Sequence, residues 1–198
     1  MSEPLVKRLE YLGIADMDYL SARILLLNGL THTGLSKAAE AFEKLFKLFL
    51  IIEAKITENK ELSQKELQQH KHKLVKLFKL VMSKLPDKKY HPSVKNYFHQ
   101  LENAYGLRYP ESWKKALLIN SLEDLDKMYC YFRNNITFNF PKEERHRAKF
   151  FGTFILKAYN KNVVDYVKKL GGMSPKDALS KHNKHLSEFN IYLDKVPL

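Results

Sequence analysis

Apolar residues recur at three- and four-residue spacing through most of the chain, and this pattern constrains the fold more than any other feature. Between residues 35 and 52 the pattern is carried by Leu35, Ala38, Phe42, Leu45, Phe49 and Ile52. Such spacing places one apolar stripe along a helix. No segment shows the strict apolar–polar alternation of a half-buried strand, and only seven Gly and seven Pro interrupt the 198 residues. We therefore predict an all-α fold.

Capping and breaking residues divide this pattern into helices. The first helix is expected from Asp16, as its N-cap, to about Asn28, because Gly29 follows as a helix-ending residue. The second begins near Gly34. The segment Ser63-Gln-Lys-Glu66 has the form of a capping box and predicts the start of a third helix.

Proline and capping residues also place the later helices. A fourth helix is expected over residues 92–107 and a fifth from Ser121 to about Asn135. Helical spacing returns after Pro141, and Ser174-Pro175 has the cap and first-turn proline of a last helix. We predict a helical bundle over residues 1–138 and a C-terminal helical extension over 139–198, packed on or beside it.

Lysines gather on the side of the third helix opposite its apolar stripe. At about 100° per residue, this arc holds Lys73, Lys76, Lys79 and Lys84. The chain has 34 basic and 22 acidic residues and a formal net charge of +12. This balance favours anionic partners such as nucleic acid, and the alternative is a solvated, lysine-coated surface. Only six of the basic residues are Arg, which indicates diffuse attraction rather than bidentate readout.

Motifs of several enzyme classes are absent from the sequence. The glycines form neither G-x-G-x-x-G nor a P-loop, and neither G-x-S-x-G nor H-E-x-x-H occurs. Cys130 is the only cysteine, which excludes an intramolecular disulfide and a zinc ribbon. His182 and His185 lie one helical turn apart and are the candidate metal ligands, although two solvated histidines explain them better, because no third protein ligand is obvious. We predict no cofactor and no metal.

The N-terminal residues lack the apolar stretch of a signal peptide. No apolar run approaches the ~18 residues that a membrane helix needs. A cytoplasmic protein that does not contact a membrane is the expectation.

Five segments in order resemble the HEPN domain. They are residues 18–29 with a Tyr and small residues, 34–47 with Glu-Lys-x-x-Lys, 72–77 with a His-led Leu stripe, 101–110 with Tyr and Arg-Tyr-Pro, and 121–135. The resemblance covers about residues 18–135. It implies an up-and-down helical bundle that is often a homodimer. Its members include ribonuclease toxins, protein partners of nucleotidyltransferases, and non-catalytic RNA- or nucleotide-binding modules of toxin–antitoxin and related systems.

The ribonuclease members of that family carry an Arg followed, after four to six residues, by a His. Arg133-Asn134 is similar to the start of that motif, but the positions for the His hold Phe138, Asn139 and Phe140. The other arginines also lack a His at this spacing. At these positions, a side chain that moves a proton near neutral pH is therefore missing.

Three readings follow from the sequence. The leading one is a non-catalytic HEPN-like protein that binds RNA, nucleotide or a protein partner. Its candidate anion-binding residues are Lys73, Lys76, Lys79, Lys84, Arg108, Arg133, Arg145 and Arg147. The second is a divergent, metal-independent ribonuclease that uses Arg133 with Asn139 or His146. The third is a dimerisation or adaptor module that binds no nucleic acid, for example a partner of a nucleotidyltransferase.

Overall fold

The computed structural model describes residues 3–62, 64–69, 73–85, 92–106, 121–149 and 175–189. Helices make up the regular structure of these ranges, which contain no strand, so the predicted all-α class is confirmed. The helices are α1 (Glu3–Leu27), α2 (Thr31–Glu58), α3 (Gln64–Gln68), α4 (Leu74–Lys84), α5 (Pro92–Gly106), α6 (Ser121–Asn139), α7 (Lys142–Ala148) and α10 (Pro175–Ser180), with a short 3-10 helix η2 (Leu186–Glu188). Within the described ranges, no helix has the length and apolarity to cross a membrane.

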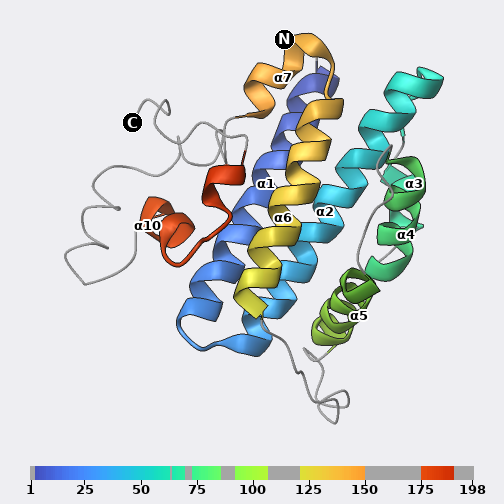
Figure 1. The fold of residues 1–198 in the computed structure, drawn as a ribbon. Coiled ribbons are helices and arrows are strands. Elements are labelled where there is room, and N and C mark those ends of the chain that lie inside the picture. Colours follow the sequence, from blue (N-terminus) through green and yellow to red (C-terminus); the bar gives the residue numbers. More distant parts are fainter. Residues whose placement is uncertain are drawn as a thin grey trace.

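Helix α2 lies at the centre of the arrangement. Figure 1 shows α1 and α6 along one side of α2, and α4 and α5 along the other, and α2 contacts all four. A tight turn joins α1 to α2, where Gly29 has a φ of 76° that a residue with a side chain rarely adopts. Gly34 then lets the two helices approach closely, because a Cβ there would lie 2.7 Å from Leu26 Cγ.

Five phenylalanine rings join α2 to α4, α5 and α6. They are Phe42, Phe46, Phe78, Phe98 and Phe132, all at most 1% exposed. Ring centroids lie 4.8 Å apart for Phe46 and Phe132, and 4.6 Å apart for Phe78 and Phe98. Burial of each side chain contributes about 1.5–3 kcal/mol. This Phe cluster is part of a larger buried apolar core. That core contains the stripe of α2 that the helical spacing predicts, Leu35, Ala38, Phe42, Leu45, Phe49 and Ile52.

Helix α1 differs most from its predicted bounds. It begins at Glu3 rather than near residue 16, so the prediction of Asp16 as an N-cap is wrong. Leu9, Leu12 and Ala15 continue the apolar face toward the N-terminus and are buried. Asp16 lies inside the helix, where its carboxylate accepts hydrogen bonds from a distant helix rather than from its own backbone.

Helix α6 is longer than predicted, because it continues past residue 135 to Asn139. The side-chain amides of Asn135 and Asn139 each donate to the carbonyl oxygen four residues earlier, at 2.8 Å. These bonds keep both asparagines within the helix. Phe140 and Pro141 then lead into α7, whose last residues also contact α6.

The predicted third helix is represented by two helices, α3 and α4, and Ser63 of the predicted capping box lies outside the described residues. The predicted fourth helix is confirmed as α5. The last predicted helix is α10, which contacts α1 and ends at Ser180, while η2 contacts α6. The described parts of the C-terminal region thus lie against the helices of the bundle. The domain division at residue 138 stays a prediction.

Candidate functional site

Three predicted lysines form an exposed row on α4 and just before it. Lys73, Lys76 and Lys79, which we call the α4 lysine row, are exposed because Leu74, Val75, Leu77, Phe78 and Val81 bury the other side of the helix. Within the described part of the chain, none of the three pairs with a carboxylate. The fourth predicted lysine, Lys84, is also exposed, but its Nζ lies 2.8 Å from Glu53 Oε1 on α2.

Helix α4 begins without a side-chain cap of its own. The backbone N–H of Val75 instead donates to Glu102 Oε2 on α5, at 2.8 Å. A carboxylate at a helix N-terminus satisfies an unpaired donor and complements the positive end of the helix. Lys73 directly precedes the first turn of α4 and has a non-helical φ of −87° and ψ of 72°.

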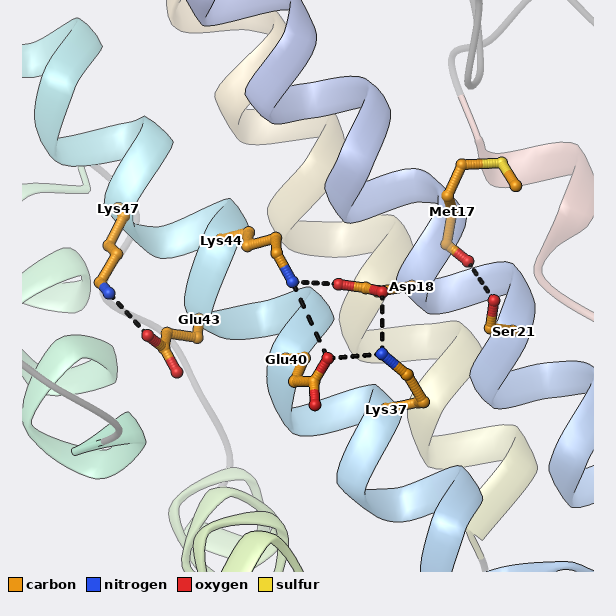
Figure 2. Close-up of polar contacts among 8 residues, drawn as sticks. All are labelled: Met17, Asp18, Ser21, Lys37, Glu40, Glu43, Lys44 and Lys47. Carbon is orange, nitrogen blue, oxygen red and sulfur yellow. Dashed lines mark hydrogen bonds and ion pairs between the residues drawn. The ribbon is translucent and has the colours of Figure 1, made fainter. Parts of the chain in front are cut away.

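The lysines of α2 are surrounded differently. Figure 2 shows Asp18 of α1 between Lys37 and Lys44, while Glu40 also binds Lys37, at 2.6 Å. One turn further along, Lys47 Nζ lies 2.6 Å from Glu43 Oε1. These carboxylates balance the positive charge of α2 locally. The α4 lysine row lacks such neighbours and presents its charge to solvent.

A second basic surface lies where α6 meets α7. We call Phe138, Lys142, Arg145, His146 and Arg147 the α6–α7 corner. Phe138 is 71% exposed, and Arg145 Cζ lies 4.9 Å from the centre of its ring. Arg145 Nε donates to the carbonyl oxygen of Phe140 at 2.8 Å, which fixes the guanidinium. Lys142, His146 and Arg147 are exposed.

Arg133, the arginine of the ribonuclease reading, is far less accessible. Arg133 is fully buried, and its Nε and Nη2 donate to the two carboxylate oxygens of Asp16 at 2.7 and 2.8 Å. Its Nη2 also donates to the carbonyl oxygen of Ala148 at 3.2 Å. In this conformation, a phosphate in solvent does not reach Arg133, whereas His146 is exposed on α7. Arg108 lies outside the described residues.

Burial of Arg133 belongs to a larger polar interface between α1 and α6. Both helices carry the spacing Asp-x2-Tyr-x3-Arg, as Asp16, Tyr19 and Arg23 on α1 and as Asp126, Tyr129 and Arg133 on α6. All six side chains are at most 1% exposed. Each copy thus presents an acid, a phenol and a cation along one buried helix face.

The two copies pair in opposite directions. Asp16 binds Arg133, and at the other end Arg23 Nε lies 3.1 Å from Asp126 Oδ1. Between them the Tyr19 and Tyr129 rings stack, with centroids 4.1 Å apart and planes 2° from parallel. Each phenol donates to the acid of the other helix.

These phenol bonds measure 2.7 Å from Tyr19 to Asp126 and 2.9 Å from Tyr129 to Asp16. The interface therefore has an approximate two-fold symmetry. The repeated spacing is visible in the sequence, but a search for repeats of fixed period does not find it.

A C-terminal segment covers one end of this interface. Arg23 donates to the carbonyl oxygens of Ala178 and Lys181 at 3.3 and 2.7 Å, and the Asn183 side chain donates to the Tyr19 hydroxyl at 3.3 Å. Burial raises the pKa of Asp126 to about 6, although Arg23 and the Tyr19 hydroxyl act in the opposite direction. Asp126 Oδ2 is buried and accepts no hydrogen bond from the described residues.

The geometry expected for a metal at His182 and His185 is not present. Helix α10 ends at Ser180, and His182 has a φ of 56°, so the two residues are not one helical turn apart. His185 Nδ1 lies 2.8 Å from Glu188 Oε1. Across the described ranges, no three His, Cys, Asp or Glu side chains are grouped to hold a metal ion. Cys130 is buried, which raises its pKa to about 12 and keeps the thiol neutral.

Comparisons of the chain with protein-family models, curated proteins and solved structures found no match in any of the three. The HEPN resemblance is therefore a prediction from the sequence alone.

Proposed function

We propose that this chain is a non-catalytic HEPN-like protein that binds RNA through the α4 lysine row. The observation that carries the proposal is the contrast between two sets of lysines. Those of α2 are balanced by Asp18, Glu40 and Glu43, whereas Lys73, Lys76 and Lys79 are exposed and pair with no carboxylate of the described chain. Unbalanced cations attract phosphates and release the counterions bound to them.

The shape of the row favours a polymer over a single nucleotide. Lys73 and Lys79 are six positions apart in the sequence, which corresponds to about 9 Å along a helix axis. Three ammonium groups at this spacing suit successive phosphates of one strand. Lysine binds phosphate as a point charge without a fixed fork of donors, so we expect little sequence preference from this surface.

The surroundings of Arg133 support the absence of catalysis. An arginine that stabilises a reacting phosphate has to touch it. Arg133 instead donates to both oxygens of Asp16 and is fully buried. The Asn139 amide, which stands at a position where the ribonuclease motif has His, donates to the Asn135 carbonyl oxygen.

A salt series with matched variants tests the proposal. We expect a fluorescently labelled RNA to bind at 50 mM salt, with an affinity that falls steeply as salt rises. The triple change Lys73→Gln/Lys76→Gln/Lys79→Gln should weaken binding about tenfold or more. It should also reduce the slope of log affinity against log salt by about 2, because each phosphate that a lysine no longer neutralises lowers that slope by roughly 0.7.

A control variant removes the same charge from lysines that are already paired. Lys55, Lys60 and Lys184 lie 3.3, 2.6 and 3.2 Å from a carboxylate oxygen, so Lys55→Gln/Lys60→Gln/Lys184→Gln matches the change in net charge. Equal weakening by both triple variants would contradict a defined surface. No binding at 50 mM salt would favour the adaptor reading, and cleavage of the RNA by the wild type would favour the ribonuclease reading.

A further inference from the structure

Phe138 is the most exposed large apolar side chain of the described residues. The other such residues are Ile14, Leu30 and Ile56, at 42, 55 and 56% exposed, against 71% for Phe138. The neighbouring aromatic residues Phe132 and Phe140 are fully buried or nearly so. Its position at the end of α6 therefore leaves an aromatic ring open to solvent, where most phenylalanines of this chain contribute to the core.

The ring is held in a defined place by a cation. Arg145 Cζ lies 4.9 Å from the ring centre, within the distance of a cation–π contact. The Arg145 guanidinium is itself fixed through its bond to the carbonyl oxygen of Phe140. Arg145 can cover only one face of Phe138, so much of the ring stays open to a second planar group.

The charge around this ring is positive. Lys142 and Arg145 are three residues apart on α7, which places them on one side of that helix. Glu144 is turned inward, where it is buried and its oxygens bind Arg8 at 2.7 and 3.3 Å. That carboxylate balances Arg8, so it does not offset the charges of Lys142 and Arg145.

We propose that the α6–α7 corner binds an unpaired base of single-stranded RNA, with the base stacked on Phe138 and the adjacent phosphates bound by Lys142 and Arg145. This inference rests on the proposed function and adds to it the class of RNA that is bound. Aromatic rings bind single strands because every base has a π-face to stack on, whereas the bases of a duplex are already stacked. A surface that docks a protein is typically a contiguous apolar patch. Within the described parts of α6 and α7, Phe138 has no exposed large apolar neighbour.

The test separates stacking from charge. Affinity is measured for a short uridine oligonucleotide and for a blunt RNA duplex, with wild type, Phe138→Ala and Phe138→Tyr. We expect Phe138→Ala to weaken single-strand binding about tenfold and to leave the salt slope unchanged, because the variant removes the stacking of one base and keeps every side chain that binds phosphate. Duplex binding should not change, and Phe138→Tyr should retain the wild-type affinity.

Two further measurements support this reading. A single-stranded oligonucleotide with one 2-aminopurine should lose fluorescence when wild type binds and keep it with Phe138→Ala. The matched change Lys142→Gln removes a charge from the same corner, so it should weaken single-strand and duplex binding alike. Circular dichroism should show the same helix content for all variants, since Phe138 and Lys142 are exposed.

Failure of this inference is distinguishable from failure of the proposed function. If Phe138→Ala binds the single strand as wild type does while the α4 lysine row variant loses affinity, the corner inference is wrong and RNA binding by α4 stands. If wild type binds neither RNA at 50 mM salt, both are wrong. If Phe138→Ala changes the oligomeric state in light scattering without changing RNA affinity, Phe138 is a protein contact and the inference is overturned.

Discussion

Helix α6 is held by buried charges where it meets α1 and by aromatic rings where it meets α2, α4 and α5. In the α1–α6 interface, Asp16 binds Arg133 and Arg23 binds Asp126, so each charge requires one partner at one position. In the Phe cluster, Phe132 contacts four rings at 4.8–6.3 Å, so its packing does not depend on one partner. Apolar packing tolerates more than one register of two helices, so we infer that the charge pairs define the register of α1 against α6.

The largest effect should come from breaking one charge pair. Arg133→Met leaves Asp16 buried without its cation, and we expect a loss of about 3–5 kcal/mol in the free energy of unfolding. The double change Asp16→Leu/Arg133→Met should recover most of that loss, because it removes both charges. Urea unfolding of wild type, Arg133→Met, Asp16→Leu and the double variant measures the coupling energy between the two side chains. A double variant as unstable as Arg133→Met would show that the interface depends on more than the matched pair.

A somewhat smaller effect should come from pH at the other charge pair. Asp126 has a pKa of about 6 in the folded chain, raised by burial from an ordinary value of 3.8. Below pH 3.8 the group is protonated in both states. Between pH 3.8 and 6 the unfolded chain ionises first, so the contribution of Asp126 to stability falls by about 3 kcal/mol as the pH rises.

Asp126→Asn is the control for this pH dependence, since its side chain does not titrate. The difference in unfolding free energy between wild type and Asp126→Asn, measured from pH 3.5 to 7, should decrease as the pH rises through this window. A flat difference would show that Arg23 and Tyr19 keep the pKa of Asp126 near its ordinary value.

Removal of one phenol should have a moderate effect and tests the symmetry of the interface. Tyr129→Phe deletes a hydrogen bond to a carboxylate, and we expect a loss of about 1.5–3 kcal/mol. Tyr19→Phe should cost at least as much, because the Tyr19 hydroxyl also accepts a bond from Asn183. Thermal unfolding of both variants makes the comparison. A much smaller loss for Tyr19→Phe would indicate that the C-terminal segment contributes nothing through this bond.

The smallest effect on stability should come from the α4 lysine row. Lys76→Gln and Lys79→Gln remove exposed charges without a carboxylate partner in the described chain, so unfolding should change by less than about 0.5 kcal/mol. The same urea titration measures this. A larger loss would mean that these lysines stabilise the fold, and their role in binding would then need variants with a different side chain.

Some of these features followed from local rules. The sequence predicts the exposed side of α4, because helical spacing places its lysines on one side and its apolar residues on the other. Burial of the apolar side then leaves the lysines exposed. The prediction of Asp16 as an N-cap is wrong although it follows a local rule, because a short acidic side chain before an apolar stretch is typical of an N-cap. The rule considers only neighbours in the chain, whereas the partner of Asp16 is Arg133 on another helix.

Arg133 and Phe138 show the limits of the same reasoning at the candidate sites. An arginine in a basic chain is normally exposed and a phenylalanine is normally buried, yet here Arg133 is fully buried and Phe138 is 71% exposed. Both lie on α6, five residues apart. Their accessibility depends on which face of α6 packs against α1 and on where the chain turns at Pro141.

The sequence by itself determined the helical class, most of the helices and the exposed row of lysines, because helical periodicity is a local property of the chain. The tertiary structure decided which charge each buried acid or cation meets, that two copies of Asp-x2-Tyr-x3-Arg face each other, and that Phe138 is left at the surface. Those outcomes depend on contacts between residues more than a hundred positions apart, such as Asp16 and Arg133. Neither the residue spacing nor the composition of α1 or of α6 specifies such contacts by itself.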